Sequence, residues 1–115
     1  IIAATATGST AYALAAGGPI LPPELRNILL VPIAPHLSVD RAVVLSEGSS
    51  VSIVVNSENS VLSVDGQLPT PLMEDDQVKV TVADVTAQFV RFGDPGYFYR
   101  NLTAHMNENS LGFPR

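Results

Sequence analysis

Short apolar runs separated by turn residues recur through the middle of the chain and restrict it to a fold built mainly from β-strands. Residues 28–34 and 42–46 are continuous apolar runs with the length of a buried strand. Residues 50–55, 78–82 and 85–89 alternate apolar and polar positions, as expected of a strand with one face in water. Turn residues recur about every 8–12 residues, a spacing typical of a β-sandwich.

Helix is expected at only two places. Residues 9–16 are a short run of helix-forming residues, which the Gly17–Pro19 segment ends. Residues 97–106 are the second candidate helix. Among the strands, residues 60–64 form a further candidate that ends at Asp65–Gly66, a dipeptide that fits the two central positions of a type I′ hairpin turn.

Composition excludes several classes of protein. At 115 residues the chain suits one domain, and 46% hydrophobic against 15% charged residues indicates a globular chain. A net charge of −5 with a single lysine, Lys79, leaves no basic stripe for nucleic acid. No apolar run approaches the ~18 residues of a membrane span. Without cysteine there is neither a disulfide nor a thiolate metal site.

A run rich in hydroxyl groups, Thr5–Thr10, stands directly before the first predicted helix. Backbone amides at the start of that helix, with the hydroxyls of Thr7, Ser9 and Thr10, predict a polar cradle for a ribose or a phosphate. The same residues also fit a strand–turn–helix joint in which Ser9 or Thr10 caps the helix. The run is neither a Walker A loop, since no Gly-Lys-Ser/Thr follows, nor a Rossmann fingerprint, since Gly8 stands alone.

The whole string from Thr7 to Ile20 resembles the Thr-Pro-Thr-Gly-Ser-Thr-Ala-Tyr-Ser-Leu-Ser-Ala-Gly-Gly-Pro motif of NAD kinases. Three more segments resemble that family in the family's order. They match its Thr-Pro-Ile-x-Pro-His-x-Leu-x-x-Arg-Pro-Ile-Val-Leu segment, its Asp-Gly-Gln turn and its closing Phe-Tyr-x-x-Leu helix, and they are Val31–Leu45, Val64–Gln67 and Tyr97–Leu102. Because these segments cover most of the chain, it resembles the C-terminal domain of a NAD kinase.

This resemblance implies a mainly β, β-sandwich-like domain of the NAD kinase/diacylglycerol kinase type, with one or two short helices. Residues 1–115 would form it as a single NAD-binding domain. The activity implied is transfer of the terminal phosphoryl group of ATP, or of polyphosphate, to the 2′-hydroxyl of NAD, giving NADP, with Mg²⁺ accompanying ATP. The resemblance also implies a cytoplasmic homo-oligomer, dimer or tetramer, with neither nucleic acid nor membrane as a partner.

The base proposed for this family is the aspartate of a Gly-Gly-Asp-Gly motif in an N-terminal α/β domain, and this chain contains no such motif. The apolar start, Ile1–Ala4, already indicates a strand, and it carries no signal-peptide pattern. We therefore expect the N-terminal domain to be absent from this chain and to be its partner. The chain itself would hold no catalytic residue and be inactive alone.

The NAD-binding residues of the family match six consecutive positions here and one glutamine further on: Thr10, Ala11, Tyr12, Ala13, Leu14, Ala15 and Gln67. The resemblance implies polar and stacking contacts from Thr10 and Tyr12, and a close backbone approach at Ala11. Ala13 and Ala15 stand where the family commonly has serine, so hydroxyl contacts are lost and affinity is expected to be lower. Gln67 would present its amide to the ligand of a partner subunit.

Several other polar residues have two interpretations each. His36 is either a hydrogen-bonded structural histidine or a nucleotide contact, and the family has a histidine there. Glu74–Asp76 forms either a solvated turn or part of a Mg²⁺ site, while Arg91 and Arg100 serve either phosphates or ion pairs. Two other function classes also stay open: a lipid kinase of the diacylglycerol/sphingosine type, and a non-enzymatic β-sandwich binding module.

Overall fold

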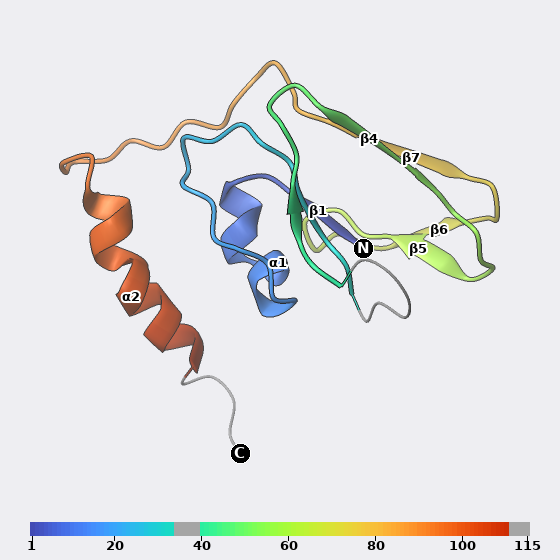
Figure 1. The fold of residues 1–115 in the computed structure, drawn as a ribbon, viewed down its shortest axis with the longest axis horizontal. Coiled ribbons are helices and arrows are strands. Elements are labelled where there is room, and N and C mark those ends of the chain that lie inside the picture. Colours follow the sequence, from blue (N-terminus) through green and yellow to red (C-terminus); the bar gives the residue numbers. More distant parts are fainter. Residues whose placement is uncertain (34–39, 111–115) are drawn as a thin grey trace. The chain divides into compact units, whose positions relative to one another are not determined.

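The computed structural model describes residues 1–33 and 40–110, and the chain divides into two compact units, Ile1–Asp84 and Val85–Arg115 (Figure 1). All the strands of the described residues lie in the first unit: β1 (Ile2–Ala4), β2 (Leu29–Val31), β3 (Val43–Val44), β4 (Ser50–Val54), β5 (Ser60–Leu62), β6 (Thr70–Leu72) and β7 (Gln77–Thr81). They form three small antiparallel sheets. The predicted mainly β class is confirmed.

The first sheet, in the order β1-β2-β3, holds the buried core. Strand β2 lies in its centre, and Leu29 and Val31 are almost fully buried. A 3₁₀ turn, η1 (Thr7–Thr10), and one α-helical turn, α1 (Tyr12–Ala15), pack beside β1. The side chains that this segment and its flanking residues pack against the core are small, namely those of Ala6, Ala13 and Ala16, so its backbone lies close to the strands.

The second sheet pairs β4 with β7, and its register follows the predicted alternation. Val51 lies opposite Val80 and Ile53 opposite Val78 on a half-buried face, while Lys79 lies opposite a serine on the exposed face. The third sheet is the β5–β6 hairpin. Pro71 is accommodated there because a two-stranded sheet leaves one edge of each strand unpaired.

Three predictions about secondary structure are corrected. Residues 85–89 form no strand, and Val85 and Phe89 are more than two-thirds exposed, because within the described chain no strand pairs with this segment. The helix expected at 9–16 is divided into η1 and α1. The second helix, α2 (Tyr97–Ser110), is longer than predicted.

No helix in the described part of the chain combines the length and the apolar character needed to cross a bilayer.

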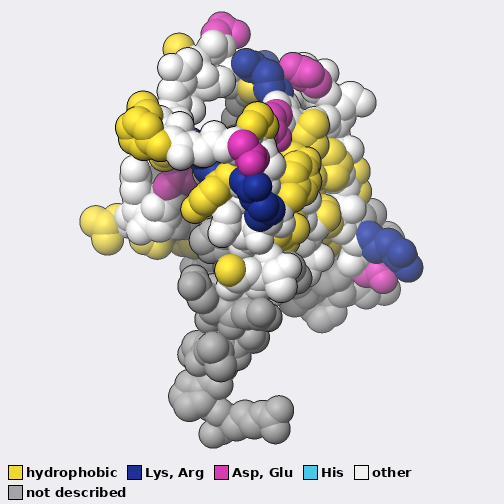
Figure 2. Space-filling view, turned by 90° about the vertical axis from the view of Figure 1, so that its left-hand side faces the viewer, with side chains coloured by type: hydrophobic (Ala, Val, Ile, Leu, Met, Phe, Trp, Pro, Cys, Tyr) yellow, Lys and Arg dark blue, Asp and Glu magenta, His cyan; other side chains and the backbone are white. Residues whose placement is uncertain are grey.

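Charged side chains lie in small mixed groups. Figure 2 shows basic side chains beside acidic ones. Arg26 lies 3.6 Å from Glu47, and Arg100 lies 2.7 Å from Asp94. These pairs are exposed, so each contributes about 1 kcal/mol at most to stability. Arg91 lies over the ring of Tyr97, with 5.2 Å between the guanidinium carbon and the ring centroid.

Candidate functional site

Ser9 is a fully buried residue in the centre of η1. Its hydroxyl donates a hydrogen bond to the carbonyl oxygen of Ala6 at 2.6 Å and accepts one from the backbone N–H of Leu21 at 2.9 Å. Both bonds are inside the chain, and the side chain has no exposed surface. The prediction that Ser9 offers its hydroxyl to a ligand is therefore wrong, and so is the prediction that it caps the helix.

Thr5, rather than Ser9 or Thr10, supplies the hydroxyl at the start of the helical segment. Its Oγ1 atom accepts the N–H of Gly8 at 3.3 Å, and its carbonyl oxygen accepts the N–H of Ser9 at 2.9 Å. The Thr10 hydroxyl donates to the carbonyl oxygen of Thr7 at 3.1 Å, and neither η1 nor α1 has a side-chain cap at its own N-cap residue. Two amides of the predicted cradle, those of Gly8 and Ser9, are thus bound within the chain.

The end of α1 is a Schellman motif, which confirms the predicted stop. Gly17 has φ +88°, its N–H donates to the carbonyl oxygen of Leu14 at 3.0 Å, and the N–H of Gly18 donates to that of Ala13 at 2.8 Å. Gly18 also touches the core, because a Cβ atom there would lie 2.8 Å from both the Ala13 oxygen and Val31 Cγ2. The helical segment is therefore attached at both ends.

Between these attachments the six residues matched to the NAD-binding stretch differ in exposure. Thr10, Ala11 and Ala15 are exposed, and Tyr12 has 64% of its surface exposed. The methyl group of Ala13 is 1% exposed and packs in the core, while the remaining member, the leucine at position 14, is half-buried. We call the surface of Thr10, Ala11, Tyr12 and Ala15 the exposed loop. It offers a hydroxyl, main-chain groups and an aromatic ring.

Gln67 lies in the turn between β5 and β6. Asp65 and Gly66 have φ of 48° and 70°, and the N–H of Gln67 donates to the carbonyl oxygen of Val64 at 2.9 Å. Positive φ at both central residues confirms the predicted type I′ turn. Gln67 is exposed, and the hydrogen bonds of the described residues do not connect it to the exposed loop. His36 lies outside the described residues.

The acidic segment Glu74–Asp76 forms a turn. The Asp76 carboxylate accepts the backbone N–H of Met73 at 2.8 Å, and Asp75 has φ 70°. Within residues 1–33 and 40–110, no group of three His, Cys, Asp or Glu side chains is placed to hold a metal ion. Of the two interpretations of this segment, the geometry favours the turn. For Arg100 it favours the ion pair, with Asp94.

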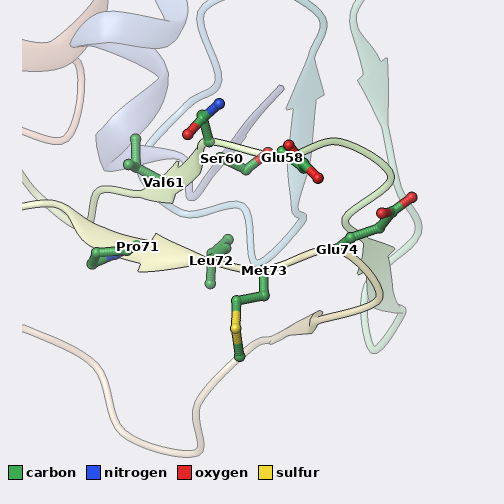
Figure 3. Close-up of a pocket in the computed structure, with 8 residues that line it drawn as sticks. Glu58, Ser60, Val61, Pro71, Leu72, Met73 and Glu74 are labelled. Atoms are coloured by element: carbon green, nitrogen blue, oxygen red, sulfur yellow. The ribbon is translucent and has the colours of Figure 1, made fainter.

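An open cavity of about 620 Å³ lies beside β5 and β6 and was not predicted from the sequence (Figure 3). Its lining combines the apolar side chains of Val61, Leu72 and Met73 with two carboxylates, Glu58 and Glu74. The carboxylates are the ionised groups of this lining, and two negative charges repel a phosphate. The cavity is therefore unsuited to the pyrophosphate of a dinucleotide, and the exposed loop remains the candidate site.

Comparisons with known proteins give one answer. The family model of the ATP-NAD kinase C-terminal domain matches residues 1–92. The NAD kinase of Chloroflexus aurantiacus is 43% identical over 110 residues, which cover 95% of this chain and 40% of that protein. The NAD kinase of Heliobacterium modesticaldum is 42% identical over 100 residues, or 85% of this chain and 35% of that protein. The NAD kinase of Koribacter versatilis is 46% identical over 86 residues, which cover 73% of this chain and 30% of that protein.

The chain spans about two-fifths, or less, of the length of these relatives. The matched residues include β1 to β7, the exposed loop and Gln67. Neither the lipid kinase nor the non-enzymatic binding module is favoured by these matches. The chain belongs to the ATP-NAD kinase C-terminal domain family.

Proposed function

We propose that this chain is the C-terminal, NAD-binding domain of a NAD kinase. The whole protein would transfer the terminal phosphoryl group of ATP, or of polyphosphate, to the 2′-hydroxyl of NAD, giving NADP. One observation carries the proposal: the family model matches residues 1–92, and relatives that are 37% and 43% identical to this chain are named NAD kinase. Residues 1–115 would act as one domain, following an N-terminal α/β domain that is its partner.

The exposed loop is the part of this chain that we assign to NAD. The Thr10 hydroxyl donates to a backbone carbonyl, which leaves its oxygen lone pairs able to accept a hydrogen bond from a ribose hydroxyl. The exposed ring of Tyr12 offers a stacking surface, and Ala11 has no side chain beyond a methyl group to block a close backbone approach. Leu14 and Ala15 continue this surface.

Two further positions of the proposed NAD-binding stretch have different roles. The Ala13 side chain is in the core and its carbonyl oxygen accepts the N–H of Gly18, so its role is to support the loop from below. Gln67 is exposed at the turn after β5, and we propose that its amide reaches a ligand bound to another subunit. We assign no catalytic side chain to this domain. Phosphoryl transfer depends mainly on positioning and charge neutralisation, and this domain would contribute the positioning of NAD.

Mg²⁺ accompanies ATP in the proposed reaction, but the described residues of this chain do not fit a magnesium site. The sequence offered Glu74–Asp76 as the candidate, and in the structure the Asp76 carboxylate accepts a backbone N–H within its own turn. We therefore assign the ion to no side chain of this domain.

A cytoplasmic homo-oligomer, dimer or tetramer, is part of the proposal. Exposed apolar side chains support a covering partner, which would be the N-terminal domain or a second copy. They are concentrated in the segment after β7 and are Val85, Phe89, Val90 and Phe92, each at least 71% exposed.

The test compares two purified proteins: this chain of 115 residues, and the longer protein with the N-terminal domain. Each is incubated with NAD, Mg²⁺ and either ATP or polyphosphate, and NADP is measured with an NADP-specific dehydrogenase. We expect NADP from the longer protein and none from the chain alone. Absence of NADP from the longer protein with both donors would refute the proposed activity, and turnover by the chain alone would refute the assignment of catalysis to the other domain.

A further inference from the structure

We infer that Ser9 is a positioning residue, whose buried hydroxyl sets the geometry in which Thr10, Ala11 and Tyr12 meet NAD. This inference rests on the proposed function. It assigns a role to a residue that touches no ligand, acts through its neighbours and lies directly before the exposed loop.

The first step concerns what the Ser9 hydroxyl connects. It joins the carbonyl oxygen of Ala6, three residues earlier, to the N–H of Leu21, twelve residues later. Leu21 is itself a core residue, with 6% of its surface exposed. The bond to Leu21 therefore closes residues 10–20 into a loop whose two ends are held together in the core. Such a closure restricts the conformations that the intervening residues can adopt.

The second step concerns how completely this contact is built. Ser9 has no exposed surface, and among the described residues no buried side-chain nitrogen or oxygen lacks a hydrogen-bond partner. If the hydroxyl were removed, the Leu21 N–H would lose its partner in a site that water does not reach. An unsatisfied buried donor is costly, and the chain can relieve that cost by moving η1 outward until water reaches the group.

The third step links that movement to the ligand. Thr10 follows Ser9 directly, and Ala11 and Tyr12 come next; the hydroxyl of Thr10, the backbone of Ala11 and the ring of Tyr12 are the exposed groups assigned to NAD. The other end of the segment 10–20 is still held against the core through Gly18. An outward movement of η1 therefore displaces the ligand-binding end of the loop and leaves the rest of the domain in place. Binding of NAD falls, while binding of ATP, which we do not assign to this loop, is unchanged.

The experiment uses the longer protein with Ser9→Ala, and Val55→Ala as the matched control. Val55 is also buried, at 8% exposure, but its backbone bonds lie with Asp75 and Asp76, away from the loop. Both variants lose stability. Only Ser9→Ala is expected to raise the KM for NAD, by about fivefold, the factor that corresponds to one net hydrogen bond. Its kcat is expected to stay within about twofold and its KM for ATP to be unchanged.

Hydrogen exchange of the Leu21 amide provides the second readout, and it is expected to accelerate in Ser9→Ala but not in Val55→Ala. Ser9→Cys, which keeps a weak donor and acceptor of similar shape, is expected to restore part of the NAD affinity and serves if Ser9→Ala does not fold. An active parent protein with an unchanged KM for NAD in both Ser9 variants would overturn the inference alone. A parent protein that makes no NADP would overturn the proposed function, and the inference with it.

Discussion

Gly18 and Val31 lie so close together that a Cβ atom added at Gly18 would stand 2.8 Å from Val31 Cγ2. The same atom would stand 2.8 Å from the carbonyl oxygen of Ala13, which accepts the Gly18 N–H. The backbone at the end of α1 therefore packs directly against a side chain of strand β2. The approach leaves no room for any residue but glycine.

The Gly18→Ala substitution is expected to lower the free energy of unfolding by about 1–3 kcal/mol, because the new methyl group forces the end of α1 away from β2. Gly93→Ala is the control, since nothing lies within 4 Å of a Cβ atom there, and its effect should be within about 0.5 kcal/mol of zero. The measurement is chemical denaturation. In a double-mutant cycle, Val31→Ala should recover part of the Gly18→Ala loss; strict additivity would show that the two side chains do not compete for the same space.

Tyr12 is expected to matter for binding and not for stability, because 64% of its surface is exposed. In the longer protein, Tyr12→Ala should weaken NAD binding by about 0.5–1.5 kcal/mol, the contribution of one aromatic stacking contact. Tyr12→Phe keeps the ring and should stay close to the unmodified protein. The measurement is the KM for NAD beside the melting temperature. Equal losses in the two variants would assign the contact to the hydroxyl instead of the ring.

The turn that carries Gln67 allows conformation and contact to be separated. Gly66 has φ 70°, so Gly66→Ala should cost about 1 kcal/mol of stability by straining the turn. Gln67→Ala changes an exposed side chain and should leave stability unchanged while raising the KM for NAD. Thermal unfolding and NAD kinetics are measured for both. If Gln67→Ala binds NAD as the unmodified protein does, this residue is no part of the site.

Asp94 performs two tasks at the start of α2, and substitutions can divide them. Its carboxylate accepts the N–H of Gly96 and pairs with Arg100 at 2.7 Å. Arg100→Ala removes only an exposed ion pair and should lower the free energy of unfolding by less than about 1 kcal/mol. Asp94→Ala also removes the side-chain acceptor near the helix start and should cost about 1 kcal/mol more. The helical circular dichroism signal during unfolding measures both, and a larger loss for Arg100→Ala would reverse the assignment.

Local patterns predicted the elements whose causes are local. The alternation in β4 and β7 and the Asp65–Gly66 turn depend on neighbouring residues, and the structure confirms them. Residues 85–89 alternate just as regularly, yet a strand also needs a partner, and the alternation alone does not supply one. Strand β6 was missed because Pro71 argues against a strand unless an open edge is known beforehand.

The candidate site divides in the same way. The exposure of Thr10 and Tyr12 agrees with the motif that identified them. The buried role of Ser9 could not be predicted, because its partner Leu21 lies twelve residues away and a hydroxyl before a helical run fits a cap equally well. The sequence identified the segment, while the packing decided which hydroxyls of that segment face inward.

The small side chains of the exposed loop have a consequence for protein engineering. The methyl groups of Ala11 and Ala15 are exposed, whereas that of Ala13 is enclosed by the core. Larger or charged side chains can therefore be introduced at positions 11 and 15 without repacking the domain. Under the proposed function a larger side chain at position 11 would block the backbone approach assigned to NAD there. Position 15 is therefore the starting point for a library that alters the choice between related dinucleotides, and position 13 is the one to leave untouched.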